Sequence, residues 1–161
     1  MLTKSLLAID PGIVLGYAYW PKNRKYPTRC GIVKPHKRSK DFFRDTHSTI
    51  HQLGDIISKL KPDAIACEWP AHFSSAGGEV AAGSGSIVKL AFNVGQIALA
   101  ADAYKCEFLP VGVNAWKGNL PKKIVKKRIQ KILLKSRLEY LKPESHAYDA
   151  IGIGLYVRGI F

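Results

Sequence analysis

The sequence contains little cysteine and no long hydrophobic run. Its three cysteines, Cys30, Cys67 and Cys106, are odd in number and widely spaced, and no two of them form a C-x-x-C pair. We therefore expect buried free thiols in a reducing compartment and no structural zinc site. No stretch approaches the roughly 20 apolar residues that a membrane span requires. The apolar run near the N-terminus is broken by Asp10 and lacks the cleavage site of a signal peptide. These absences predict a cytoplasmic protein with no membrane partner, and they leave a bacterial, phage or organellar source open.

Acidic residues are also scarce. The 161 residues include 25 lysines and arginines but only 12 aspartates and glutamates, which leaves a formal net charge of +13. The apolar fraction of 47% is that of a globular chain, and we expect one domain spanning residues 1–161. A positive excess of this size is typical of proteins that bind a polyanion, either nucleic acid or an anionic membrane surface.

The basic residues are concentrated in two stretches that contain no acid. Together, residues 20–40 and 117–137 hold 17 of the 25 basic residues. In the second stretch Pro121 suits the first turn of a helix. The lysines that recur four apart along this helix are Lys123, Lys127, Lys131 and Lys135. Because like charges along one ridge repel each other, we favour a surface that contacts phosphates over the alternative of a plain solvated face.

The chain opens with an apolar run that ends at a single carboxylate. Residues 6–9 are apolar, Asp10 follows, and Pro-Gly leads into a second apolar run over residues 15–20. This pattern predicts a hairpin of two strands, with a third strand over residues 30–33. A carboxylate at the end of a buried strand is costly unless it is paired or holds a cation. The alternative is that Asp10 caps the turn with its own side chain.

The next segments predict a crossover connection. Apolar residues recur at spacings of three and four over residues 41–60, which indicates an amphipathic helix that ends at Pro62. The strand over residues 64–68 ends in Glu68, and a strand–helix–strand order places the two strands parallel in one sheet. Because functional groups in open α/β sheets gather at the carboxyl ends of strands, we expect Asp10 and Glu68 at the same edge. The alternative for Glu68 is an ordinary surface glutamate.

With one more strand over residues 106–111, the predicted fold class is α/β. It is a mixed five-stranded sheet flanked by helices, in which the first three strands are antiparallel and the later ones parallel. A helix is predicted from its N-cap Ser86 to about Tyr104, and it is apolar around almost its whole circumference. Only Lys89, Asn93 and Gln96 form a narrow polar stripe. We expect this helix to be buried on more than one side, either within the monomer or between the sheet and a second subunit.

The last predicted helix begins at Ser145, a good N-cap, and carries His146 and Asp149 on one face of its first turns. A lone histidine or aspartate in such a helix is more often a capping or hydrogen-bonded group, whereas a pair on one face is a better ligand candidate. With Asp10 and Glu68 they make three carboxylates and one imidazole, a donor set that favours Mg²⁺ or Mn²⁺ over zinc. Two such ions, roughly 3.5–4 Å apart, suit in-line attack on a phosphodiester.

The order and context of these residues resemble the RuvC-type Holliday junction resolvases. The matching features are Ile-Asp-Pro-Gly at 9–12 with Gly-Tyr-Ala at 16–18, the strand that ends in Glu68, Ser86-x-x-Lys89-Leu90, and His146-x-x-Asp149-Ala150. The resemblance spans about residues 6–157 and implies a ribonuclease-H-like fold. It also implies a homodimer formed through the helix that starts near Ser86, and two Mg²⁺ ions per active site for which Mn²⁺ substitutes. No small-molecule cofactor is expected.

The resemblance implies catalytic roles for individual residues. The residues at the matching positions are Asp10, Glu68, His146, Asp149 and Lys122, of which the first four are the expected metal ligands. His146 stands where many members have a fourth aspartate, so it is either a ligand or a general base. Lys122 resembles a lysine that lies near the scissile phosphate, with Lys117 and Lys123 as alternatives.

The family also places an aromatic residue three positions after the glutamate, where it stacks on an opened base. Here that position is Ala71, so Trp69, His72 or Phe73 would have to substitute. Other DNA contacts are expected from the apolar helix and the basic stretches. The expected DNA-binding residues are Lys89, Phe73, Lys117, Lys123, Lys127, Arg24, Lys37 and Arg38.

We therefore expect a dimeric, Mg²⁺-dependent crossover junction endodeoxyribonuclease that acts in DNA recombination and repair. It would resolve four-way DNA junctions by paired symmetric nicks through phosphodiester hydrolysis. One alternative is a monomeric nuclease of the same fold that processes structured RNA. Another is a catalytically silent nucleic-acid-binding protein, in which the acids are structural and the positive charge binds the polyanion.

Overall fold

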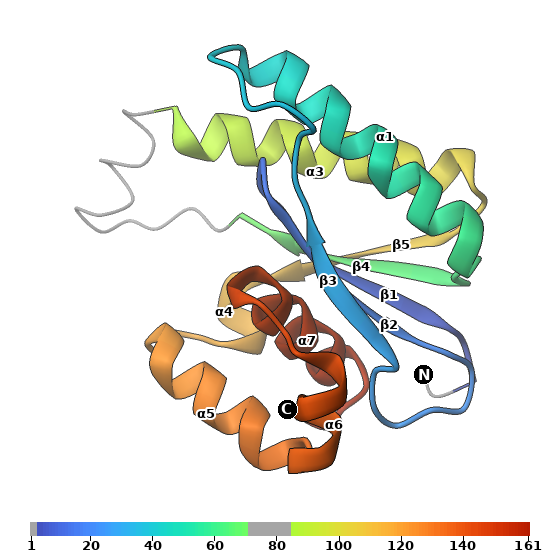
Figure 1. Cartoon of the computed structure of the whole chain (residues 1–161), viewed down its shortest axis with the longest axis vertical. Helices are drawn as coiled ribbons and strands as arrows, with labels where there is room; N and C mark the ends of the chain where they lie inside the picture. Colours follow the sequence, from blue (N-terminus) through green and yellow to red (C-terminus); the bar gives the residue numbers. More distant parts are fainter. Residues whose placement is uncertain (1–2, 71–84) are drawn as a thin grey trace.

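Apolar runs that end at turn residues form a five-stranded mixed sheet (Figure 1). The computed structural model describes residues 3–70 and 85–161. The strand order is β3-β2-β1-β4-β5; β1, β2 and β3 are antiparallel neighbours, while β4 is parallel to both β1 and β5. The strands are β1 (Leu6–Asp10), β2 (Leu15–Trp20), β3 (Arg29–Val33), β4 (Ala64–Trp69) and β5 (Glu107–Gly112). The predicted fold class is therefore confirmed.

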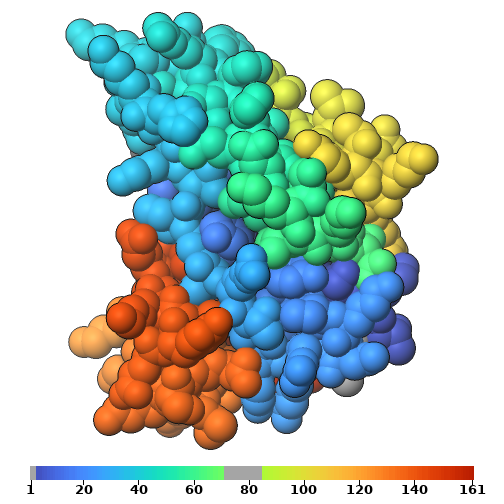
Figure 2. Space-filling view, turned by 45° about the vertical axis from the view of Figure 1, so that its right-hand side comes forward, coloured from blue at the N-terminus to red at the C-terminus, as the bar shows by residue number. Residues whose placement is uncertain are grey.

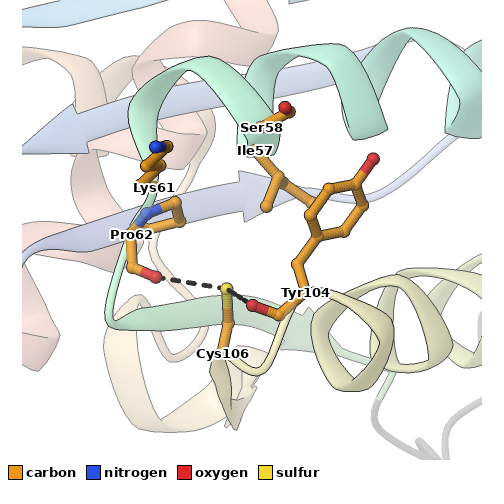
Figure 3. A pocket seen from close by; sticks show the side chains of 6 residues that line it. All are labelled: Ile57, Ser58, Lys61, Pro62, Tyr104 and Cys106. Carbon is orange, nitrogen blue, oxygen red and sulfur yellow. Dashed lines mark hydrogen bonds between the residues drawn. The ribbon is translucent and has the colours of Figure 1, made fainter.

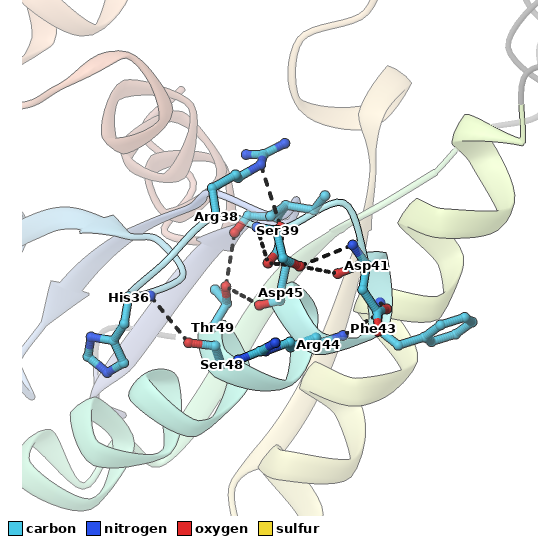
Figure 4. Close-up of polar contacts among 10 residues, drawn as sticks. His36, Arg38, Ser39, Asp41, Phe43, Arg44, Asp45, Ser48 and Thr49 are labelled. Carbon is cyan, nitrogen blue, oxygen red and sulfur yellow. Dashed lines mark hydrogen bonds and ion pairs between the residues drawn. The ribbon is translucent and has the colours of Figure 1, made fainter.

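The crossover that makes β4 parallel to β1 is the helix α1 (Phe42–Leu60). It begins where the Asp41 side chain accepts hydrogen bonds from the backbone N–H groups of Phe43 and Arg44, as Figure 4 shows. It ends at Lys61, which adopts a left-handed conformation, just before Pro62. The apolar residues over 41–60 were expected to form one core-facing stripe, but the side chain of Phe43 is 65% exposed and packs edge-on against Phe42 and Phe92.

The remaining helices cover both faces of the sheet. In Figure 1, α1 and α3 lie on one face, and α4 to α7 lie on the other. The later helices are α3 (Ser86–Ala103), α4 (Val113–Trp116), α5 (Lys122–Ile132), α6 (Lys135–Leu141) and α7 (Ser145–Val157). Two buried apolar cores result, one on each face. In the space-filling view of Figure 2, the cyan and green residues of α1 and the orange residues of the C-terminal part lie toward opposite ends, with blue N-terminal residues between them.

Three local expectations were wrong. The basic helix predicted after Pro121 divides in two, because buried Leu133 is extended and turns the chain between α5 and α6. Lys135 therefore leaves the predicted lysine ridge. The N-cap positions of α3 and α7 are held by Gly85 and Glu144, so the expected cap residues Ser86 and Ser145 lie one position inside their helices.

The polar stripe of α3 does not face solvent throughout. Asn93 is buried against α1, where its side-chain oxygen accepts a 3.0 Å hydrogen bond from the Thr46 hydroxyl. Apolar residues of α3 are exposed in its place: Val88 is 69% and Leu99 is 63% accessible. The apolar circumference of this helix is thus only partly covered within one chain.

All three cysteines are free; Cys67 and Cys106 are buried, whereas Cys30 is only half-buried. No helix among the described residues has the length and apolar character needed to cross a membrane.

Candidate active site

Two acidic side chains meet at the carboxyl edge of the central strands. Asp10 is the last residue of β1, and Glu68 is the next-to-last residue of β4. The parallel register pairs Ile9 with Cys67, so the two acids that follow lie side by side. Their side chains are only 14% and 12% exposed. The edge predicted from the strand–helix–strand order therefore has this pair of carboxylates, of which Glu68 is buried and Asp10 is partly buried.

The start of α7 brings two more of the predicted residues to the same edge. Gly16 pairs with Asp10 across the hairpin, and a Cβ atom on Gly16 would collide with the backbone of His146. A glycine is required here because β2 and α7 approach so closely. His146 Nδ1 lies 2.9 Å from Oδ2 of Asp10. Asp149 follows one turn later on the same helix and is also largely buried.

Each of the other two carboxylates is paired with a lysine. Lys122, the first residue of α5, places its Nζ 2.8 Å from Oδ2 of Asp149. Lys117, which follows α4, places its Nζ 3.2 Å from Oε2 of Glu68. The same glutamate oxygen accepts a 2.7 Å hydrogen bond from the indole Nε1–H of Trp116. Three carboxylates, two ammonium groups and one imidazole are therefore gathered at this edge.

Burial perturbs the ionisation of this cluster. Desolvation raises the pKa of Asp10, and the negative charge of Asp149 adds to the rise, while the hydrogen bond from His146 opposes it. Desolvation also raises the pKa of Glu68, against the opposing effects of Lys117 and Trp116. The hydrogen bond to Asp10 raises the pKa of His146. The neighbouring basic groups therefore compensate the carboxylate charge only in part.

The chemistry of the donors suits a hard divalent cation. Carboxylate oxygens with one imidazole are ligands for Mg²⁺ or Mn²⁺, and bound positive charge would favour the ionised form of acids whose pKa burial has raised. Within residues 3–70 and 85–161, no three acidic, histidine or cysteine side chains already stand in a metal-binding arrangement. Lys117, Lys122 and His146 contact the carboxylates instead. The donor set fits such an ion once these contacts open.

Some of the predicted DNA-binding residues lie around this edge. Val33 ends β3 opposite Leu15, so the segment that follows it, with Lys37 and Arg38, starts at the edge that holds Asp10. Figure 4 shows Arg38 beside Asp45, with its Nε 3.6 Å from Oδ2 of that buried aspartate. The aspartate also accepts hydrogen bonds from Ser39, so it anchors the segment before α1.

Lys89 lies on α3 beside the turn that follows Asp10. It lines a shallow hollow with Gly12 and Ile13, and its ammonium group stands 5.8 Å from the centroid of the Phe42 ring. Lys123 and Lys127 are exposed on α5, the helix that begins at Lys122. Lys89 and the lysines of α5 thus lie on helices that cover opposite faces of the sheet.

Other predicted residues are not brought to the site. Arg24 lies between β2 and β3, at the far edge where Trp20 pairs with Leu6. Phe73 and His72 fall outside the described residues. Of the three candidate aromatics, only Trp69 is described; it is 48% exposed at the end of β4 and lines an apolar hollow with Phe108.

Sequence reasoning missed Trp116, which donates a hydrogen bond to Glu68. A tryptophan followed by a lysine just after the strand next to Glu68 was the available signal. Gly16 belongs to the Gly-Tyr-Ala segment that matches the resolvases, but its close approach to the backbone of His146 was not predicted. Lys117 was expected to contact DNA or to lie near the scissile phosphate, and in the structure it pairs with Glu68.

A mixed sheet in this strand order, with acids at the carboxyl ends of its two central parallel strands, defines the ribonuclease-H-like fold. Comparison with solved structures finds this fold in Holliday junction resolvases. A RuvC structure from Thermus thermophilus superimposes with a TM-score of 0.67 at 22% identity, covering 94% of this chain and 92% of that one. T. thermophilus RuvC in complex with a Holliday junction substrate gives a TM-score of 0.66 at 20% identity, covering 94% and 91%.

The yeast mitochondrial Holliday junction resolvase Ydc2 is a more distant neighbour, with a TM-score of 0.57 at 14% identity and coverage of 98% of this chain and 79% of that one. No protein-family model and no curated protein matches this chain. The recognised resemblance to RuvC-type resolvases is therefore confirmed at the level of the fold.

Proposed function

We propose that this protein is a structure-selective DNA endonuclease that resolves four-way junctions by paired symmetric nicks, in DNA recombination and repair. The observation that carries the proposal is the convergence of Asp10, Glu68, His146 and Asp149 at one edge of a ribonuclease-H-like sheet. The solved resolvases of the same fold, one of them bound to a Holliday junction, support DNA as the substrate.

In the proposed mechanism, Asp10, Glu68 and Asp149 would hold two divalent cations, Mg²⁺ or Mn²⁺, with His146 as a further ligand or as a base. Such ions would supply an activated water and charge stabilisation for the leaving oxygen. The Nδ1 atom of His146 faces Asp10, which leaves Nε2 to accept a proton from the water. Lys117 and Lys122 contact the carboxylate oxygens that the cations would occupy, so both ammonium groups would then be free to contact the scissile phosphate.

We further propose a homodimer that forms through α3. Val88, Phe92 and Leu99 are large apolar residues exposed along this helix, and apolar surface that gathers on one element often marks an interaction site. A twofold axis through α3 would provide two equivalent active sites, as paired cuts in a four-way junction require. The basic surface that includes Lys89, Lys123 and Lys127 would hold the phosphates of the junction arms.

The proposal is tested by incubating the protein with a synthetic four-way junction, a plain duplex and a structured RNA, each with and without Mg²⁺. We expect paired nicks in the junction alone, and only with the metal. Preferential cleavage of the RNA would favour the RNA-processing alternative, and junction binding without cleavage would favour the silent binding protein. Light scattering gives the mass in solution, for which we expect two chains; a Leu99→Glu variant should be monomeric.

A further inference from the structure

We propose that Trp116 is a positioning residue for Glu68, and that it couples this carboxylate to the helix that carries Asp149. The inference rests on the proposed function, since Glu68 is a proposed metal ligand. It adds a residue that makes no contact with the metal or the DNA and acts only through the glutamate.

The hydrogen bond between the two side chains is short and buried. The indole Nε1–H donates to Oε2 of Glu68 at 2.7 Å, and Trp116 and Glu68 are only 3% and 9% exposed. An indole can only donate, so the contact favours a carboxylate in one fixed orientation. Lys117 reaches the same oxygen but keeps 27% of its side chain exposed, so it is free to move where the indole is not. The rigid donor is therefore the tryptophan.

The indole ring is held by α7. A Cβ atom on Gly152 would collide with the Trp116 ring, so the ring lies directly against the helix backbone at this position. Gly152 comes three residues after Asp149, on the same face of the helix. Phe161 packs on the other part of the ring, with the two centroids 5.9 Å apart. The position of α7 thus determines the position of the donor, and through it that of the Glu68 carboxylate.

A second tryptophan provides a matched control. Trp20 is also fully buried, and its ring lies against Gly154 of the same helix. Its Nε1–H, however, has no hydrogen-bond partner among the residues that the structure describes. The two side chains therefore share the same packing against α7 and differ in whether the indole N–H binds a carboxylate.

The test compares Trp116→Phe with Trp20→Phe, using Mn²⁺ affinity by titration calorimetry and the Mg²⁺ dependence of junction nicking. Loss of a group that orients a ligand typically costs about 10- to 100-fold in metal affinity or activity. We expect a loss in this range for Trp116→Phe, with junction binding in EDTA unchanged, and no change for Trp20→Phe. In a Glu68→Gln background, Trp116→Phe should have no further effect on Mn²⁺ affinity.

A second pair of variants keeps both indoles. It distinguishes a specific effect on Mn²⁺ affinity from a general loss of stability. Gly152→Ala pushes the Trp116 ring away from its place, and Gly154→Ala does the same to Trp20. We expect both to lower the melting temperature, but only Gly152→Ala to weaken Mn²⁺ binding. Equal Mn²⁺ affinity across each pair would overturn the proposal. Because calorimetry needs no DNA, a protein that binds Mn²⁺ but never cuts junctions would contradict the proposed function and leave this inference testable.

Discussion

At the two ends of the central parallel strands, the surroundings shift the pKa values of carboxylates in opposite directions. At the amino edge, Asp63 accepts hydrogen bonds from both the backbone N–H and the hydroxyl of Ser5, each at 2.7 Å, and these bonds lower its pKa. At the carboxyl edge, burial raises the pKa of Asp10 and Glu68. At one end of the β1–β4 pair, hydrogen bonds therefore stabilise the ionised form of a carboxylate. At the other end, burial disfavours the ionised form of two carboxylates.

The difference separates a structural edge from the edge that we propose as the active site. Asp63 joins the start of β1 to the start of β4, and the Ser5 hydroxyl in turn accepts from the Asp63 backbone N–H. Figure 3 shows the nearby end of α1, where the Cys106 thiol donates to the carbonyl oxygen of Pro62 at 3.1 Å. Contacts of this kind stabilise the fold and leave nothing for a ligand. Poorly compensated acids at the other edge reduce stability, which is a common property of sites that bind a cation.

The largest expected effect is on cleavage. Asp149→Asn should reduce Mg²⁺-dependent nicking of a four-way junction by roughly a thousandfold or more, because it removes a proposed metal ligand. Junction binding in EDTA should be unchanged or slightly tighter, since a negative charge is lost near the DNA. Gel-based nicking assays and mobility shifts measure the two quantities.

The matched control for that variant is Asp63→Asn at the amino edge. It should retain nicking and lower the free energy of unfolding by about 1 kcal/mol, the usual contribution of a hydrogen bond to a folded protein. If it abolished nicking as well, the contrast between the two edges would be wrong.

The next effect concerns DNA binding and its dependence on salt. Replacing Lys123, Lys127 and Lys131 of α5 by alanine should weaken junction binding. It should also reduce the slope of log Kd against log salt by about one for each lysine that contacts a phosphate. Lys4 and Lys22 pair with Glu107 and Asp63 at the amino edge, and their replacement by alanine should leave that slope unchanged. Fluorescence anisotropy over a range of KCl concentrations distinguishes the two sets.

A third prediction is that the metal-free protein loses stability as the pH rises. The raised pKa values of Asp10, Glu68 and His146 mean that the folded state holds these protons more tightly than the unfolded chain does. The contribution of these three groups to the free energy of unfolding is fully present below their ordinary pKa values. It is lost as the pH rises through their raised pKa values in the folded state. Asp63 has the opposite sign: its stabilisation is present above the ordinary value of 3.8 and is lost as the pH falls through the lowered one.

Urea unfolding in EDTA at a series of pH values measures this dependence. In Asp10→Asn, the free energy of unfolding should fall less steeply with pH. This change removes one group with a raised pKa and also the hydrogen bond that raises the pKa of His146. A wild-type protein whose stability increased between the ordinary pKa of histidine and alkaline pH would contradict the assignment of these shifts.

The smallest effect is expected for the exposed ion pair at the amino edge. Lys4 and Glu107 stand 2.6 Å apart, but about half of each side chain is accessible to solvent. Because water and salt screen an exposed pair, Lys4→Ala should change the free energy of unfolding only slightly. A larger loss would mean that the amino edge depends on charge pairing rather than on the hydrogen bonds between Ser5 and Asp63.

Most of the fold was predictable because it follows from local patterns and simple chain topology. The alternation of apolar runs and turns predicted the hairpin, and the amphipathic stretch before Pro62 predicted the crossover helix. A crossover between parallel strands then brings Asp10 and Glu68 to one edge, since parallel strands share the direction in which they end. The start of α7 at Ser145 was predicted from the helix-capping preference of serine, although the N-cap position itself is held by Glu144.

The sequence by itself thus determined which chemical groups this protein has. It also determined the order of the strands and helices along the chain. Only the tertiary structure decided the contacts between them: Lys122 with Asp149, Trp116 with Glu68, and the backbone of His146 against Gly16. Trp116 and Glu68 are 48 positions apart in the chain, so no local pattern relates them. The physical reason is that secondary structure depends on neighbours in sequence, whereas the charge balance of a buried site depends on which distant side chains packing brings within hydrogen-bonding distance.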